Sequence, residues 1–286
     1  RRLGDMDATG TLPGWDTLAA LDDNALPLLD VALLIARDEY PDLDPRRYAL
    51  RVQGHAAHLR GVVERESHPA LKMRAINRYL FEEVGYAGNH DEYYDPRNSY
   101  LNEVFERRLG NPVSLALVQM AVARAVGLPL DGISFPGHFL VRLPVDDGVL
   151  VMDPFNRGRP LDVDELRERA QAHLGGRAPD DEVLSRILNP ASNRAILVRV
   201  LRNLHAVYHG HGDWERATRS ADRVLRLLPG DPEALRDRGA GYLQLGHVAG
   251  AREDLQRYLL LRPHAEDAAS IRLRLVETGR APARLH

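Results

Sequence analysis

The sequence predicts an α+β protein: a helical N-terminal region, a core with a small antiparallel sheet, and an all-α repeat unit at the end. Three observations support this class. Apolar residues recur at helical spacing between about 15 and 85, two short β-type runs follow at 139–143 and 149–152, and features of the last third repeat every 34 residues. The parts we expect are residues 1–85 and 86–190, which form the first domain, and the repeat unit 191–286.

The composition excludes several classes of function. Cysteine is absent from the 286 residues, which excludes disulfides, thiolate zinc sites, iron–sulfur clusters and a cysteine nucleophile. The 38 Lys and Arg nearly balance the 41 Asp and Glu, so no long-range attraction to nucleic acid or an anionic membrane is expected. No apolar run approaches the roughly 18 residues of a membrane span, and no signal peptide is evident. We expect a cytoplasmic protein without cofactor or metal, since glycine-rich phosphate loops and His-Glu-x-x-His are also absent.

The N-terminal region contains start and stop signals for three helices. An apolar stripe over residues 26–35 predicts the first helix. Asp44 is a good N-cap and Pro45 suits the first turn, so a second helix begins there. Pro69 opens a third helix, which ends near Gly85. We predict that the apolar residues of these helices pack in a core and that this region contributes no functional site.

Residues 86–110 change character because tyrosines crowd around turn-forming residues. The tyrosines of this stretch are Tyr86, Tyr93, Tyr94 and Tyr100. Such a segment is predicted to be a structured loop that packs its rings, either in a core or beside a binding site. A helix follows it, with Asn111 as N-cap, Pro112 at the first position and Gly127 as the stop.

The two β-type runs predict a hairpin whose register is open. A loop at 144–147 places His138 opposite Asp153, whereas a tight turn at 147–148 places Arg142 opposite Asp153. The first register brings together an imidazole and a carboxylate. The second makes an ordinary ion pair.

The last third has the 34-residue period of tetratricopeptide repeats. The pairs at this spacing are Gly212 with Gly246, Ala217 with Ala251, and Pro229 with Pro263. Small residues such as Gly239 let the paired helices approach, but His205 occupies the equivalent position of the first copy. A capping helix is expected at 265–278. Because two repeats rarely fold alone, we expect this unit to depend on the first domain.

Three polar residues of the middle segment form a candidate catalytic set. Ser114 lies in the first turn of the helix capped by Asn111, where backbone N–H groups favour developing negative charge. His138 enters the first strand and Asp153 leaves the second. A nucleophile at a helix start followed by a histidine and a carboxylate is a papain-like order of nucleophile, base and orienting group.

Four motifs around these residues resemble the SirB-type transglutaminase-like family of bacteria. The motifs occupy residues 93–101, 107–115, 136–142 and 153–155. The resemblance implies a transglutaminase-like core followed by tetratricopeptide repeats. It also favours the register that pairs His138 with Asp153. Candidate ligand-binding residues taken from the motifs are Tyr94, Asp95, Asn98, Asn111, Phe139 and Phe155.

The resemblance implies that Ser114 stands where catalytic relatives carry cysteine. A cysteine beside a histidine is stored as a thiolate, but a serine must lose its proton during attack. The sequence also lacks the Gly-x-Ser-x-Gly elbow of many serine hydrolases. It therefore favours a non-catalytic protein that binds a protein or peptide partner.

Other interpretations stay open at this point. One is a serine-variant hydrolase or acyltransferase that uses Ser114, His138 and Asp153. Another is a function confined to the repeats. The three residues also have structural explanations: a bond within the helix turn for Ser114, a core position for His138 and a strand-end cap for Asp153.

Overall fold

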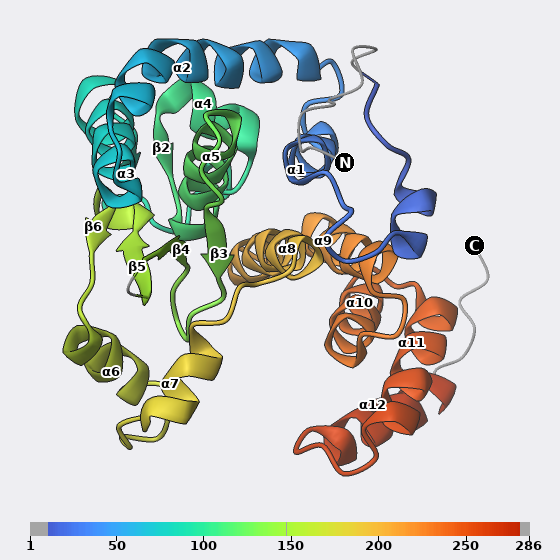
Figure 1. Ribbon diagram of the computed structural model, residues 1–286. Helices are drawn as coiled ribbons and strands as arrows, with labels where there is room; N and C mark the ends of the chain where they lie inside the picture. The colour runs from blue at the N-terminus through green and yellow to red at the C-terminus, as the bar shows by residue number, and fades with distance from the viewer. Residues whose placement is uncertain (1–10, 147, 281–286) are drawn as a thin grey trace. The chain divides into compact units, whose positions relative to one another are not determined.

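The computed structural model describes residues 11–146 and 148–280 and confirms the α+β class (Figure 1). Its contacts divide the described chain into two compact units. The first unit contains residues 11–13 and 21–200, and the second contains 14–20 and 201–280. Helix α8 (Asn193–Gly210) is continuous, so this division falls inside a helix and not at residue 191.

The N-terminal helices begin where the sequence predicts. They are α1 (Leu28–Arg37), α2 (Pro45–Arg65) and α3 (Pro69–Asn77), and α3 continues into the π-helical turn η2 (Arg78–Glu83). The Asp44 carboxylate accepts a hydrogen bond from the backbone of the first turn of α2, as expected of an N-cap.

Residues 86–110 contain more regular structure than a loop. Two short strands, β1 (Ala87–Gly88) and β2 (Leu109–Gly110), pair in parallel. Between them lie the 3-10 turn η3 (Pro96–Asn98) and helix α4 (Leu101–Arg107). These elements are too short to produce a readable sequence period.

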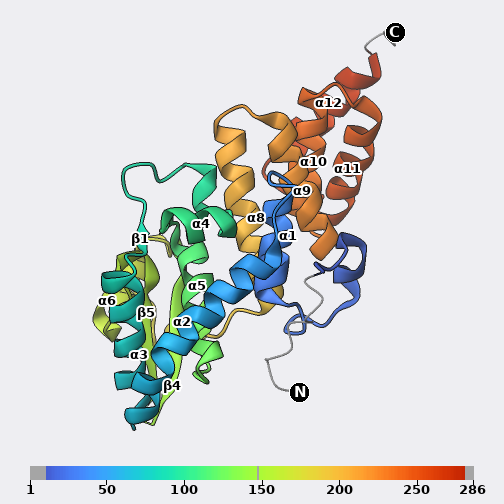
Figure 2. The same ribbon diagram turned by 90° about the horizontal axis from the view of Figure 1, so that it is seen from above.

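Helix α5 (Pro112–Ala125) is the central element of the first unit. All of its first twelve residues except Ala121 are buried, and it contacts α1, α2, α3, α4 and strand β4. A helix surrounded by protein is apolar on every side, which explains why its sequence shows no single apolar stripe. Its first turn therefore lies deep inside this unit (Figure 2).

A four-stranded antiparallel sheet follows, in the order β3-β4-β5-β6. The strands are β3 (Asp131–Ile133), β4 (Leu140–Val145), β5 (Gly148–Asp153) and β6 (Arg159–Pro160). Both predicted registers are wrong: Val145 pairs with Gly148 and Val141 with Met152, an offset midway between the two. Residue 147, which both predicted turns included, lies outside the described residues.

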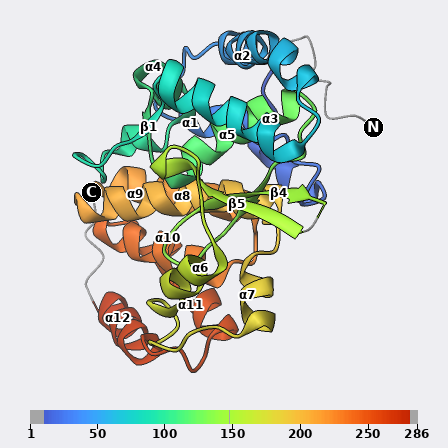
Figure 3. The ribbon, with the colours of Figure 1, turned by 60° about the vertical axis from the view of Figure 1, so that its left-hand side comes forward.

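Helices cover both faces of this sheet (Figure 3). Helices α3 and α5 contact β4 from one side. On the other side, α6 (Val163–Gln171) and α7 (Asp181–Ile187) close a second core cluster. That cluster consists of Ile133, Phe135, Leu140, Val151, Leu161, Leu166, Ala170 and Leu184. The site discussed below sits at the end of β5, where the sheet meets α6.

The second unit consists of helical hairpins. After the end of α8 come α9 (Trp214–Leu227), α10 (Pro232–Gln244), α11 (Val248–Leu261) and α12 (Ala268–Arg280). A Cβ at Gly239 would lie 2.8 Å from the Leu255 side chain, so the close approach of α10 and α11 requires glycine. The first repeat accommodates His205 differently, because its Nδ1 hydrogen-bonds the Ala217 carbonyl at 3.0 Å.

In the described part of the chain, no helix combines the length and the apolar character that crossing a bilayer requires.

Candidate functional site

The predicted nucleophile is built into the cap of α5. Asn111 and Ser114 form a reciprocal capping box, in which each side chain accepts a hydrogen bond from the other residue's backbone N–H, both at 3.0 Å. The Ser114 hydroxyl donates to the Asn98 carbonyl at 2.6 Å. Ser114 is fully buried. Its hydroxyl proton is therefore committed to a backbone acceptor.

Buried asparagines extend this cap into the preceding segment. Asn98 donates to the carbonyls of Glu92 and Tyr93, and its own side-chain oxygen accepts from Asn89 at 3.0 Å. Asn111 donates to the Ser99 hydroxyl at 2.8 Å. Two residues predicted to contact a ligand, Asn98 and Asn111, are thus buried and hold the segment after β1 against α5.

His138 and Asp153 form a direct contact at 2.9 Å, from His138 Nε2 to Asp153 Oδ1. His138 was predicted to enter the first strand of the hairpin. It lies instead in the turn before β4. Gly137 in this turn has a φ of +67°, and the His173 ring packs where a side chain would project. The contact therefore arises from the turn geometry and not from cross-strand pairing. Arg142 takes no part, since it donates to the Leu188 carbonyl at 2.6 Å.

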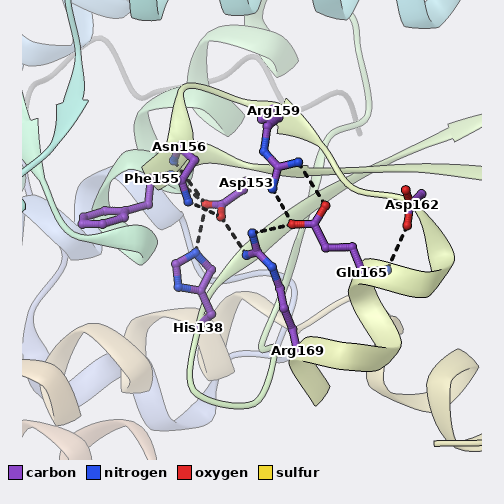
Figure 4. Close-up of polar contacts among 8 residues, drawn as sticks. All are labelled: His138, Asp153, Phe155, Asn156, Arg159, Asp162, Glu165 and Arg169. Carbon is purple, nitrogen blue, oxygen red and sulfur yellow. Dashed lines mark hydrogen bonds and ion pairs between the residues drawn. The ribbon is translucent and has the colours of Figure 1, made fainter. Parts of the chain in front are cut away.

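The Asp153 carboxylate is completely buried and accepts hydrogen bonds from several directions (Figure 4). The backbone N–H of Phe155 and the side chain of Asn156 donate to it at 3.1 and 2.6 Å. Arg169 of α6 donates to Oδ2, the oxygen that also accepts from Asn156, at 3.0 Å. Burial raises the pKa of Asp153, but the hydrogen bonds from His138, Asn156 and Arg169 outweigh burial and hold that pKa well below its usual range.

An ionised carboxylate fixes the imidazole tautomer. Asp153 only accepts hydrogen bonds, so Nε2 of His138 carries the proton and Nδ1 is left with its lone pair in the neutral ring. Among the described residues, Nδ1 has no hydrogen-bond partner. The His138 side chain is 20 % exposed, so part of the ring is accessible from solvent.

Hydrogen bonds among the described residues join His138 to Asp153 but do not join Ser114 to either of them. Within residues 11–146 and 148–280, none links the Ser114 hydroxyl to His138; its partners are Asn98 and Asn111. The local cap satisfies the hydroxyl with two short backbone contacts. Turning it toward the imidazole would break both contacts in a buried site. The Asn111 N–H and the Asn98 carbonyl would then keep only their direct hydrogen bond to each other, at 3.2 Å.

A group of aromatic rings surrounds Phe155 next to His138. The ring centroids of His90, Tyr93 and His138 lie 4.5, 5.8 and 6.1 Å from that of Phe155. Tyr93 and its neighbour Tyr94 are 43 % and 70 % exposed. We call His90, Tyr93, Tyr94, His138 and Phe155 the aromatic surface.

The remaining predicted binding residues lie elsewhere. Asp95 caps η3 and bonds Arg97, and Phe139 is buried in the core. Sequence reasoning missed His90 and Arg169. His90 shows no periodic signal, and Arg169 reaches Asp153 only through the packing of α6, a helix that was not predicted. In the described part of the chain, no three His, Asp or Glu side chains are grouped so that they could hold a metal ion.

Comparison with known proteins agrees with this architecture. A family model of the transglutaminase-like superfamily matches residues 46–202, and a tetratricopeptide-repeat model matches 204–276. A UPF0162 protein of Xylella fastidiosa is 63% identical over 275 residues, which cover 96% of this chain and 98% of that protein. A UPF0162 protein of Pseudomonas aeruginosa is 32% identical over 250 residues, covering 87% and 90% of the two chains. The chain belongs to the UPF0162 family.

The predicted resemblance is therefore confirmed: this UPF0162 chain carries a transglutaminase-like domain followed by tetratricopeptide repeats. A eukaryotic protein shares part of it. F-box only protein 21 of Mus musculus is 28% identical over 218 residues, which are 66% of this chain and 33% of that protein.

We predict that Ser114→Ala destabilises this UPF0162 protein by about 1–3 kcal/mol, because the buried Asn111 N–H and Asn98 carbonyl each lose a partner. Urea unfolding followed by circular dichroism measures the change. The control is Ser185→Ala on the exposed face of α7, which should stay within about 0.5 kcal/mol of wild type. Equal effects of the two substitutions would contradict a structural role for the Ser114 hydroxyl.

The lowered pKa of Asp153 predicts a pH-dependent contribution to stability. A carboxyl whose folded pKa is depressed stabilises the fold above its unfolded pKa of about 3.9, and this stability is lost as the pH falls. Asp153→Asn breaks a buried charged network, for which a cost of about 3–5 kcal/mol at pH 7 is expected.

The gap in unfolding free energy between wild type and Asp153→Asn should narrow as the pH is lowered from 5 toward 2. Exposed Asp164, whose side chain is 97 % accessible, supplies the control Asp164→Asn, with little effect at any pH. A gap for Asp153→Asn that stays constant across this range would show that its ionisation does not support the fold.

Proposed function

We propose that this chain is a non-catalytic member of the transglutaminase-like superfamily that binds a protein or peptide partner. The observation that carries the proposal is the placement of the Ser114 hydroxyl. Attack by a serine requires a base aimed at its proton. Here the proton is held by the Asn98 carbonyl inside a buried cap, and no hydrogen bond among the described residues leads from it to an imidazole.

The first binding surface in this proposal is the aromatic surface. Exposed tyrosines supply large contact areas at small entropic cost and are enriched at protein interfaces. Tyr93 and Tyr94 are exposed, and the open Nδ1 of His138 accepts a hydrogen bond from a peptide N–H at the same place. In this role Asp153 fixes the tautomer and the direction of the acceptor.

The second binding surface is in the repeat unit. A cavity of about 360 Å³ lies between α8, α9 and α10. Its lining combines apolar residues with polar groups, including His205, His209, Trp214, Arg236 and Asp237. Tetratricopeptide repeats generally mediate protein–protein interaction, and this mixed lining fits a peptide segment that carries both kinds of side chain.

One observation favours a second candidate, a serine-variant hydrolase or acyltransferase. The His138–Asp153 contact provides an oriented base on a partly exposed side chain, whose second ring nitrogen makes no hydrogen bond among the described residues. Catalysis would require the Ser114 hydroxyl to leave the cap of α5. It would then have to come within about 3.2 Å of the second ring nitrogen of His138.

Covalent labelling separates the two candidates. We predict that incubation with a fluorophosphonate probe and with an activated ester gives no adduct on Ser114 in intact-mass and peptide analysis. Ester turnover should be the same for wild type and Ser114→Ala, because the hydroxyl cannot deliver its proton to a base. A stoichiometric adduct on Ser114 that disappears in His138→Ala would instead establish the hydrolase.

Site-specific photocrosslinking tests the aromatic surface. A benzophenone amino acid at Tyr94 should capture a discrete partner in cells, and Tyr93→Ala should weaken that product several-fold because it removes a neighbouring ring of the surface. The matched position is Leu50 of α2, which is 65 % exposed and is not part of the aromatic surface. The same product from both positions, or its persistence in Tyr93→Ala, would contradict binding at this surface.

A further inference from the structure

A short N-terminal segment belongs to the repeat unit. Residues 14–20, which include the 3-10 turn η1 (Trp15–Ala20), group with the repeats and contact α9, whereas residues 21–200 form the other unit. Leu18 is fully buried. We call residues 14–20 the strap.

The strap contacts α9 through three kinds of side chain. In a 3-10 turn, residues three apart lie on the same side, which places Trp15 and Leu18 on one face. The Arg223 guanidinium lies 4.8 Å from the centre of the Trp15 ring, a cation–π distance. Asp16 forms an ion pair with Arg226. The aromatic ring and the carboxylate thus meet cationic partners on α9, and the leucine three positions after the ring is buried.

The receiving surface extends beyond the strap. A cavity of about 340 Å³ remains beside Trp15, and it is lined by apolar groups and by arginines of three helices. The lining outside the strap is Leu225, Arg226, Pro229, Leu235, Arg238 and Arg257. Arg257 is exposed and, among the described residues, makes no ion pair. Of the other two lining arginines, Arg226 pairs with Asp16 of the strap. Arg238 pairs with two aspartates of the repeat unit. Apolar volume and the charge of Arg257 are therefore left for a longer segment with a further acidic residue.

We propose that this face of the repeat unit is a docking site for a partner peptide of the strap's chemistry: an aromatic residue, an acidic residue beside it, and a leucine three positions after the aromatic one. The strap occupies the site in cis. A six-residue 3-10 turn with one fully buried side chain is a weak element, so a partner segment that also fills the cavity displaces it.

Because the strap already occupies the site, a partner peptide must bind tightly enough to displace it. A segment tethered by a short linker competes at an effective concentration of about millimolar. A free peptide of the strap's own sequence should therefore bind poorly to the intact chain and well to a chain whose strap is released. This site is separate from the aromatic surface, so the two proposals stand or fall independently.

The test uses the full chain and a fluorescein-labelled peptide of residues 11–22. Fluorescence anisotropy should show at least tenfold tighter binding to Trp15→Ala/Leu18→Ala than to wild type. Adding Arg226→Ala to the released chain should weaken binding at least fivefold, and adding Arg274→Ala, on an exposed position of α12, should not. A peptide with alanine in place of Trp15, Asp16 and Leu18 should not bind. Equal binding to wild type and released chain would overturn the proposal.

A second measurement decides the matter if the released chain misfolds. Trp15 and Trp214 are the two tryptophans, so Trp214→Phe makes Trp15 the single reporter of the strap. A saturating strap peptide with phenylalanine for its tryptophan should shift Trp15 emission to longer wavelength as the strap leaves. Unchanged emission would overturn the proposal, and a shift that follows protein concentration without peptide would assign the site to a second copy of the chain.

Discussion

The hydrogen bond from the Ser114 hydroxyl to the Asn98 carbonyl is the contact on which the account of this domain depends. It connects the start of α5 with the segment that carries the exposed tyrosines. The same hydroxyl accepts from the Asn111 N–H, so one small side chain satisfies two buried backbone groups. A residue with this task has little freedom to act as a nucleophile. The serine therefore supports the scaffold that presents the aromatic surface.

The imidazole–carboxylate contact persists without the nucleophile because it has structural support of its own. Asp153 receives hydrogen bonds from the turn that follows β5 and from Arg169, which in turn bonds Glu165 at 2.9 Å. This network keeps the carboxylate ionised and the imidazole oriented. In a catalytic site, such an arrangement orients a general base. Beside exposed aromatic rings it can also orient a hydrogen-bond acceptor toward a bound peptide, since it presents one acceptor in a fixed direction.

The sequence predicted the parts of the fold that depend on local chemistry. The cap at Asn111 and the helix start at Pro45 followed from backbone preferences that act within a few residues. The repeats followed from glycine, alanine and proline that recur 34 residues apart. Strands of two or three residues and helix α6 carry no such signal. The hairpin register depends on the turn and on pairing with the flanking strands together. The observed pairing lies between the two registers that the predicted turns would give. The role of Arg169 arises from tertiary packing, which spacing along the chain does not encode.

The position of the Ser114 Oγ atom in a high-resolution crystal structure, with and without a covalent ester analogue, tests the central claim most directly. We expect Oγ within hydrogen-bond distance of the Asn98 carbonyl and the Asn111 nitrogen in both crystals, with the analogue unattached. An Oγ turned toward His138 Nδ1 at about 3.2 Å or less, or bonded to the analogue, would contradict it.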